Sequence, residues 1–395
     1  MSSPKVLHLS TYDAHGGAAR AATAIHNSLD SAAVDSRIRI AKADDLRFKL
    51  AKEADRRLWR LQKSDALTWR SPARFGSISA KEINNSGADI VHMHWVTDGF
   101  LTIESIGQIK KPIVWSLCDA WAFSGAEHYA TQFSRKRSVL GYLPSNRSPN
   151  DSGFDLDRWT WNRKKSKWTK PMHVLPASTW LTHATQESAL MGHWPITQIP
   201  HIVDTNLFTD TNDIRKNVAQ PVILFLASGG VRDTRKGADL LIQALKDPAM
   251  TQRLKVIIVG PHPTAQEEQH ISFGLNHDLV FHGEARGDKE LIDLYLQADV
   301  TVVPSREDNM PIAAMESQSC GTPVVAFRIG GLGDIVNPTT SGYLAEPENT
   351  HDLAQGIVQV LNSNLRESTR QHARATWSPE VIVPQLLAVY ESALS

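Results

Sequence analysis

The sequence predicts two doubly wound α/β domains, each built on a parallel sheet. Two observations support this prediction. First, 395 residues are too many for one ordinary hydrophobic core, because a domain averages roughly 150 residues. Second, short apolar runs typical of buried parallel strands alternate with helical patterns, and this alternation occurs twice along the chain.

The first series of elements lies in residues 1–200. An Ala-rich helix is expected at residues 18–29, and residues 46–63 have the spacing of apolar side chains that favours a second helix. The expected strands are short and apolar, and they lie at residues 6–10, 36–40, 90–94, 113–117 and 173–177.

The second series follows a polar stretch after residue 200, so we place one domain in residues 1–200 and the other in residues 201–378. A C-terminal helix at residues 379–395 is expected to cross back to the first domain. The expected strands are at 222–227, 255–260, 279–282, 300–304 and 323–327, and the expected helices at 237–245, 289–297, 311–319 and 353–361.

Composition excludes several classes of protein. Lys and Arg together number 42, as do Asp and Glu, and this zero net charge disfavours a general nucleic-acid binder. Two cysteines exclude a disulfide scaffold, and no apolar run approaches the ~20 residues that span a bilayer. The apolar run at the N-terminus is too short for a signal peptide, so a cytoplasmic or peripheral membrane protein is expected.

The first candidate site is the sequence GGAAR at residues 16–20, between a predicted strand and a helix. Gly16 and Gly17 would let a ligand approach the backbone, and the N-terminus of the helix favours negative charge. The alternative is a tight turn that needs glycine for its backbone angles.

The second candidate site is the loop GGVRDTRKG at residues 229–237, which follows a predicted buried strand. Its cations are Arg232, Arg235 and Lys236, and glycines flank them. Several cations beside glycines suit a diphosphate, whose charge a single Lys would neutralise incompletely. A solvated loop is the alternative.

The third candidate site contains Asp308 and Glu316, eight residues apart around the start of a predicted helix. Asp308 alone could be an N-cap. Glu316 has apolar neighbours in the sequence, where an unpaired carboxylate would be costly, so it is a candidate acceptor for the hydroxyls of a sugar or ribose.

Together these motifs resemble the retaining glycosyltransferases of family 4, which have the GT-B fold of two Rossmann-like domains facing each other across a cleft. The resemblance covers nearly the whole chain. Its strongest parts are DNMPIAAMESQSCGTPVVAF (308–327) with Gly330 and Gly331, RKG (235–237) and GGAAR. The Asp-Asn-x-Pro version resembles a subgroup that also shares ADIVHMHWV (88–96), WSLCDAWAFSGAEHY (115–129) and an Arg/Lys/Trp run near 158–168.

The resemblance implies a role for each candidate residue of the second domain. Glu316 should bind the ribose of the donor nucleotide, and Asp308 with the backbone of Asn309 and Met310 should meet the donor sugar. Arg235 or Lys236 should hold the diphosphate.

In the first domain, the resemblance implies that Gly16 and Gly17 approach the donor and that Cys118, Asp119 and His128 belong to the catalytic site, together with Asp308 of the second domain. Core packing is the alternative for His128. Cys118 departs from the subgroup, which has a His there that is expected to contact the donor sugar near its reacting carbon.

A second departure lies in the phosphate loop, where the family's Arg falls on Gly230 or Val231. Arg232 or Arg235 would then substitute for it.

By this resemblance the protein is a hexosyltransferase that moves a sugar, with retention, from a UDP-sugar or GDP-sugar to a hydroxyl acceptor. The acceptor is expected to be lipid-linked or a glycan, in cell-surface polysaccharide or glycolipid synthesis. No cofactor and no metal ion are expected. A nucleotide-sugar epimerase, a phosphorylase and a non-catalytic nucleotide- or carbohydrate-binding protein are the alternatives.

Charge is distributed unevenly along the chain. Residues 1–200 hold 27 Lys and Arg against 18 Asp and Glu, and residues 135–170 alone hold ten against three. Trp159, Trp161 and Trp168 lie in that stretch, which suggests an anionic membrane surface as a partner, at the inner face of the plasma membrane.

Three histidines, His8, His92 and His94, fall on predicted strands of the first domain. Because they are dispersed in the sequence, they are expected to be core or cleft-wall residues rather than metal ligands.

Overall fold

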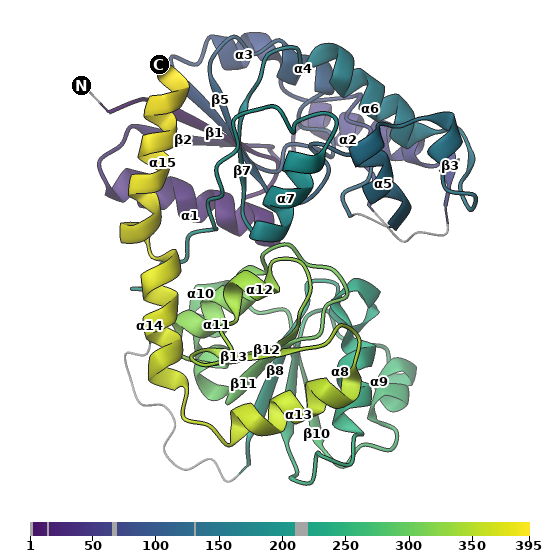
Figure 1. Ribbon diagram of the computed structural model, residues 1–395, viewed down its shortest axis with the longest axis vertical. Helices are drawn as coiled ribbons and strands as arrows, with labels where there is room; N and C mark the ends of the chain where they lie inside the picture. The colour runs from purple at the N-terminus through teal and green to yellow at the C-terminus, as the bar shows by residue number, and fades with distance from the viewer. Residues whose placement is uncertain (1–2, 14–15, 65–68, 130–131, 210–219) are drawn as a thin grey trace. The chain divides into compact units, whose positions relative to one another are not determined.

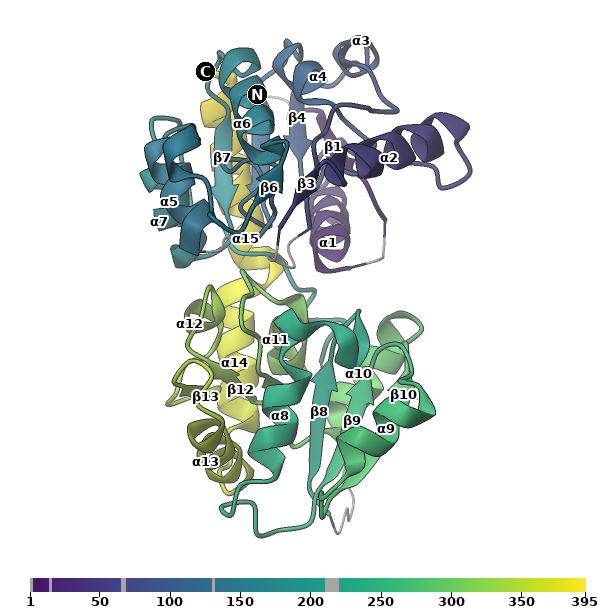
Figure 2. The same ribbon diagram turned by 90° about the vertical axis from the view of Figure 1, so that its right-hand side faces the viewer.

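The computed structural model describes residues 3–13, 16–64, 69–129, 132–209 and 220–395. The chain divides into two compact units: an N-terminal unit of residues 1–200 and 383–395, and a C-terminal unit of residues 201–382. Within each unit, helices lie on both sides of a sheet, as Figures 1 and 2 show.

The N-terminal unit contains a five-stranded parallel sheet with the order β2-β1-β4-β5-β7. The strands are β1 (Val6–Ser10), β2 (Ser36–Ile40), β4 (Ile90–Met93), β5 (Ile113–Leu117) and β7 (His173–Pro176). The order of strands reverses between β1 and β4, and in open α/β sheets this is where ligands bind, beyond the carboxyl ends of the strands.

The two faces of this sheet differ in character. Leu7 and Leu9 of β1 join the main hydrophobic core of the unit, together with Val91 and Met93 of β4. Because side chains alternate along a strand, the intervening His8 lies on the opposite face, where it pairs in register with His92.

The helices of the N-terminal unit are α1 (Gly17–Ser31), α2 (Leu46–Trp59), α3 (Ala80–Asn84), α4 (Ile103–Gly107), α5 (Gln132–Leu140), α6 (Leu156–Lys167) and α7 (Thr179–Glu187), with a short 3-10 turn η1 (Pro144–Asn146). Helix α15 (Pro379–Leu394) contributes its residues from Val383 onward to this unit. There Tyr390 is fully buried and hydrogen-bonds to His92.

The C-terminal unit contains a six-stranded parallel sheet with the order β10-β9-β8-β11-β12-β13. Its strands are β8 (Val222–Leu226), β9 (Lys255–Val259), β10 (Asp278–Gly283), β11 (Val300–Val303), β12 (Val324–Phe327) and β13 (Gly342–Ala345). The order of strands reverses between β8 and β11, so the loops after these two strands form the edge where a ligand is expected.

The helices of the C-terminal unit are α8 (Ala238–Leu245), α9 (Ala265–Ser272), α10 (Gly287–Gln297), α11 (Ile312–Ser319), α12 (Leu332–Ile335), α13 (Thr350–Leu361) and α14 (Arg366–Trp377), with 3-10 turns η2 (Gly230–Arg232) and η3 (Thr234–Lys236). Apolar side chains of β8, β9, β11, β12, α8 and α13 form its core.

All ten predicted strands are confirmed within one or two residues at each end, but β13 was not predicted. One helix prediction is wrong at its C-terminal end. Helix α2 stops at Trp59, and Gln62 and Lys63 form a short strand, β3, that pairs with β6 (Ser152–Gly153). The chain leaves the helix because Gln62 is buried and its amide donates to the carboxylate of Asp157.

Candidate active site

In the N-terminal unit, the chain after β5 holds the carboxylate of Asp119 in a fixed position. One of its oxygens, Oδ1, accepts from the backbone N–H of Trp121 at 2.9 Å. The other, Oδ2, lies 2.6 Å from Nδ1 of His128 and accepts from Nε1 of Trp95 at 3.0 Å. Burial opposes ionisation of Asp119, but His128 and these hydrogen bonds together hold the pKa of its carboxyl below the ordinary value.

His128 is oriented through both of its ring nitrogens. Nδ1 faces Asp119, and Nε2 lies 2.8 Å from Oγ of Ser71. The ring of His128 is stacked with that of Trp121, with 6.2 Å between the ring centroids. The centroid of the Trp95 ring lies 5.3 Å from that of His128. Asp119, His128 and Ser71 thus form a hydrogen-bonded chain, and the imidazole of His128 packs against the indoles of two tryptophans.

The resemblance predicts Cys118, Asp119 and His128 as catalytic residues, and the structure places all three on the wall of one small pocket. Burial and the adjacent Asp119 raise the pKa of the Cys118 thiol, so it stays protonated at neutral pH. Trp95 also lines the pocket, but neither it nor Ser71 was singled out from the sequence.

Lys164 stabilises the turn between Asp119 and His128 by hydrogen bonds to its backbone. Its ammonium is fully buried and donates to the carbonyl oxygens of Trp121, of Ser124 at 3.1 Å and of Gly125 at 2.7 Å. Nζ also lies 3.8 Å from the centroid of the Trp121 ring. The turn is therefore held by the amino group of Lys164 in α6, although that helix begins nearly thirty residues further along the chain.

Part of the basic stretch 135–170, for which an anionic membrane partner is expected, is buried. Trp161 and Trp168 are only 5% and 4% exposed, and Lys164 not at all. The rings of Trp115, Trp121 and Trp168 pack on one another in the core of the unit. Trp168 therefore cannot contact a membrane surface.

Gly16 lies at the start of α1 with φ of +90°, a backbone conformation that side-chain-bearing residues rarely adopt. A Cβ atom on Gly16 or Gly17 would meet nothing within 4 Å, so the conformation alone explains the requirement for glycine at position 16. The tight-turn alternative is thus supported here, while a role in donor binding stays a prediction.

In the C-terminal unit, Asp308 forms an ion cluster with the loop that follows β8. Nζ of Lys236 lies 2.6 Å from Oδ2 of Asp308, and Nη1 of Arg235 lies 3.8 Å from the same oxygen. Burial opposes ionisation of this carboxyl, but Lys236 and Arg235 hold its pKa below the ordinary value. The loops after β8 and β11 thus meet at the edge where the order of strands reverses.

Glycines make the close approach of these loops possible. Gly237 has φ of +71°, and a Cβ there would lie 1.9 Å from the carbonyl oxygen of Pro304. A Cβ on Gly330 would lie 1.8 Å from the carbonyl oxygen of Asp308. Larger residues at either position would push the loops apart and separate Lys236 from Asp308.

Arg232 is not part of this cluster. Its guanidinium pairs with Glu267 at the start of α9, at 2.6 Å, and half of its side chain is exposed. Of the three loop cations predicted to hold a diphosphate, the structure therefore brings only Arg235 and Lys236 together with Asp308.

Glu316 lies in α11, where its neighbours are buried and it is itself only 4% exposed. Its Oε2 accepts from the hydroxyl of Tyr295 at 3.0 Å. Asn309 and Met310, also predicted to bind the donor, are buried just before this helix. Tyr295 was not predicted as a partner, because it lies in α10, 21 residues earlier in the chain.

The three histidines that lie apart in the sequence are all buried, as expected for core residues. His8, His92 and His94 converge in the N-terminal unit, where one candidate ligand atom from each lies within 4.8 Å of the others. They meet because β1 and β4 are neighbours in the sheet and His8 is in register with His92.

Comparison with known proteins supports the sequence resemblance. Residues 209–376 match the sequence model of a family described as "Glycosyl transferases group 1". Over 212 residues the chain is 35% identical to a D-inositol 3-phosphate glycosyltransferase of Geodermatophilus obscurus, covering 49% of this chain and 47% of that protein. The matches thus span about half the length of the curated relatives.

Solved structures resemble the chain over nearly its whole length. Sucrose-phosphate synthase from Thermosynechococcus elongatus has a TM-score of 0.66 at 17% identity, covering 98% of both chains. Anabaena Alr3699/HepE, solved in complex with UDP-glucose, has a TM-score of 0.59 at 15% identity, covering 98% of this chain and 100% of that one. The chain has the GT-B fold, with two Rossmann-like α/β domains.

Proposed function

We propose that this protein is a retaining glycosyltransferase that moves a sugar from a nucleoside diphosphate sugar to a hydroxyl acceptor. The observation that carries the proposal is the Lys236–Asp308–Arg235 cluster at the edge of the C-terminal sheet. The match of residues 209–376 to the group 1 glycosyltransferases covers this cluster. The complex of Anabaena Alr3699/HepE with UDP-glucose supports a nucleotide sugar as donor.

In this proposal the charged side chains of the C-terminal unit have different roles. Lys236 and Arg235 bind the diphosphate and stabilise the negative charge that develops on it when the bond to the sugar breaks. Glu316 accepts hydrogen bonds from the ribose hydroxyls, and Asp308 with the backbone of Asn309 orients the sugar. The leaving phosphate oxygen takes the proton of the acceptor hydroxyl on the same face, so the anomeric configuration is retained.

The N-terminal unit supplies polar groups in addition to the donor-binding groups of the C-terminal unit. Asp119 and His128 are held rigidly by Ser71, Trp95 and the turn that Lys164 binds. We assign the acceptor to this unit. The thiol of Cys118 cannot provide the positive charge of an imidazolium, so we assign the polar contacts of this pocket to Asp119 and His128.

The first test is a thermal-shift panel with UDP, GDP, ADP and TDP, because a bound ligand stabilises the folded protein by mass action. We expect UDP or GDP to raise the melting temperature, and the matching nucleotide sugars to be turned over with an acceptor. Conversion of a nucleotide sugar without any acceptor would indicate an epimerase, and binding without turnover of any donor would indicate a non-catalytic protein.

Lys236→Ala should weaken binding of the nucleoside diphosphate far more than binding of the nucleoside. Loss of a charge-assisted contact costs about 1.5–3 kcal/mol, which corresponds to roughly a 10- to 150-fold weaker diphosphate complex. Calorimetry with UDP and uridine, or with GDP and guanosine, measures both affinities. Lys246→Ala, which removes an exposed cation of the same unit, is the matched control. Equal losses for both ligands would mean that the loop is only structural.

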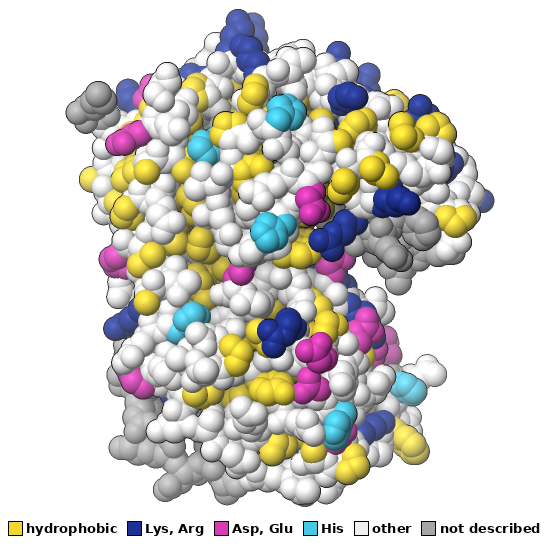
Figure 3. All heavy atoms as spheres, in the orientation of Figure 1, with side chains coloured by type: hydrophobic (Ala, Val, Ile, Leu, Met, Phe, Trp, Pro, Cys, Tyr) yellow, Lys and Arg dark blue, Asp and Glu magenta, His cyan; other side chains and the backbone are white. Residues whose placement is uncertain are grey.

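We further propose that the N-terminal unit contacts an anionic membrane and that the acceptor is lipid-linked or a surface glycan. No helix in the described part of the chain is long and apolar enough to cross a bilayer. Large apolar side chains are nevertheless exposed around α5 and α6, where Figure 3 shows them interspersed with Lys and Arg. These exposed residues are Leu61, Val139, Leu140, Leu143 and Phe154.

Sedimentation with anionic liposomes tests this contact. Binding should occur at low salt and fall at high salt, because exposed Lys and Arg contribute about 1 kcal/mol each near an anionic surface. Replacing the exposed Arg158, Lys165, Lys167 and Lys170 together by Gln should abolish sedimentation and leave nucleotide binding intact. Absence of binding to anionic vesicles at low salt would contradict the membrane contact.

A further inference from the structure

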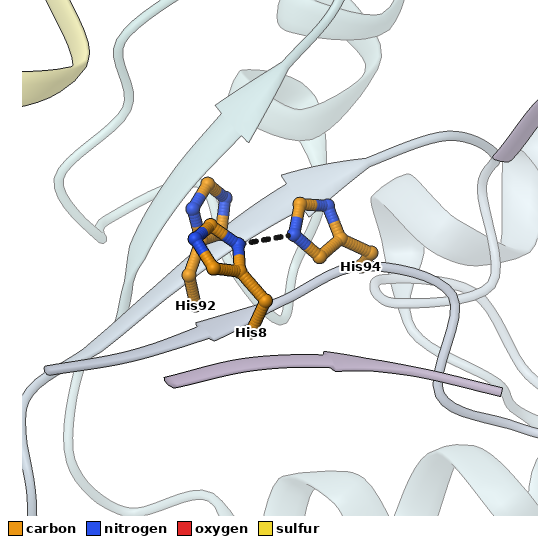
Figure 4. Close-up of side chains that lie close together, drawn as sticks. All are labelled: His8, His92 and His94. Carbon is orange, nitrogen blue, oxygen red and sulfur yellow. Dashed lines mark hydrogen bonds between the residues drawn. The ribbon is translucent and has the colours of Figure 1, made fainter. Parts of the chain in front are cut away.

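Three histidines of the N-terminal unit form a cluster to which the proposed transfer assigns no role, although one of them, His94, also lines the small pocket beside Cys118 and Asp119. His8 and His92 come from the neighbouring strands β1 and β4, and His94 directly follows β4 (Figure 4). Each of the three residues is at most 2% exposed. Ring centroids of His8 and His92 are 4.9 Å apart, and those of His92 and His94 are 4.3 Å apart.

We propose that His8, His92 and His94 bind one divalent transition-metal ion, such as Zn²⁺. Imidazole nitrogen is a preferred ligand of zinc, and three nitrogens from three histidines are a common donor set. Candidate ligand atoms of the three residues lie within 4.8 Å of one another. Zinc–nitrogen bonds of about 2.0–2.1 Å in tetrahedral geometry place two ligand nitrogens roughly 3.4 Å apart. Small rotations of the rings would therefore close the site.

The hydrogen bonds of His92 favour such a site. Its Nδ1 lies 2.7 Å from the hydroxyl of Tyr390, and its Nε2 lies 2.8 Å from Oγ of Ser116. Either nitrogen can therefore bind the ion while the other keeps a hydroxyl partner, which is the outer hydrogen bond that metal-bound histidines usually make.

His8 provides an independent indication. Its Nδ1 lies 2.9 Å from Nε2 of His94, as the dashed line in Figure 4 shows, but its own Nε2 is buried without a hydrogen-bond partner in the described part of the chain. A buried polar nitrogen without a partner is costly. Coordination of an ion would remove this cost. The ion would connect β1 and β4 and, through His92, Tyr390 of α15.

Zinc itself is the probe for the experiment. The full chain is stripped of metal with a chelator, given one equivalent of Zn²⁺ and desalted, and the retained zinc is measured. We expect about one zinc ion per chain and an increase of several degrees in the unfolding temperature of the N-terminal unit. His8→Gln and His92→Asn should each retain less than about a tenth of that zinc, because three ligands are needed to hold the ion.

His193→Gln is the matched control, because His193 is an exposed histidine of the same unit and its loss should change nothing. Co²⁺ bound to the wild-type protein should show the visible absorption of a tetrahedral, nitrogen-ligated ion, and this readout stands even if the variants fail to fold. Failure of the wild-type protein to retain zinc, or equal retention by His8→Gln and wild type, would overturn the proposal. None of these measurements depends on sugar transfer, so their outcome is separate from the proposed function.

Discussion

Lys164→Met should destabilise the N-terminal unit by at least about 3 kcal/mol, because three buried carbonyl oxygens lose their donor at once. Met keeps most of the volume of the Lys side chain. The loss of folding free energy therefore measures the missing hydrogen bonds rather than the cost of a cavity. A loss of this size is a large fraction of the 5–15 kcal/mol that typically separates folded from unfolded domains.

Urea unfolding followed by circular dichroism measures this effect, and Lys165→Met is the matched control. Lys165 is the next residue in α6 and its side chain is exposed, so its replacement should change stability by no more than about 0.5 kcal/mol. If the two variants were equally stable, the buried ammonium would not hold the turn of residues 121–125.

Glu316→Gln should reduce sugar transfer by at least about tenfold while the protein stays folded. Gln keeps an oxygen that can accept from the hydroxyl of Tyr295, but it removes the charge that strengthens hydrogen bonds to the donor. Steady-state kinetics with the donor identified by the thermal-shift panel measures the loss, and calorimetry shows whether it arises in binding.

Glu284→Gln provides the control for this variant, because Glu284 is an exposed glutamate of the same unit. An unchanged affinity of Glu316→Gln for the donor would count against Glu316 as the ligand of the ribose. A loss of folding in Glu316→Gln would instead assign this carboxylate to the core of the unit.

Sequence patterns predicted the strands well, because a parallel strand covered on both faces is a continuous apolar run. Strand β13 was missed because its sequence, GYLA, is short and follows a turn. Its pairing with β12 depends on Gly342, where a Cβ would lie 1.8 Å from the carbonyl oxygen of Val324. Close approaches of this kind depend on tertiary structure and leave no periodic pattern.

The candidate site was predicted only in part, because partners distant in the sequence decide its geometry. Asp119 and His128 are nine residues apart and were identified together, whereas Ser71 is 57 residues before His128. The burial of Lys164 was not predictable from a run of Lys and Arg residues, since its acceptors lie about 40 residues earlier. Sequence spacing locates charged groups, but only the fold shows which of them are buried.

The return of residues 383–395 to the N-terminal unit has a consequence for synthesis on the ribosome. Tyr390, which packs against His92, is translated only after the entire C-terminal unit. The N-terminal unit therefore cannot complete its core until residues 383–395 have been synthesised. All residues of the C-terminal unit are synthesised before that point. A nascent chain halted before residue 383 should hold an N-terminal unit that is more readily cleaved by protease than the same unit in the released protein.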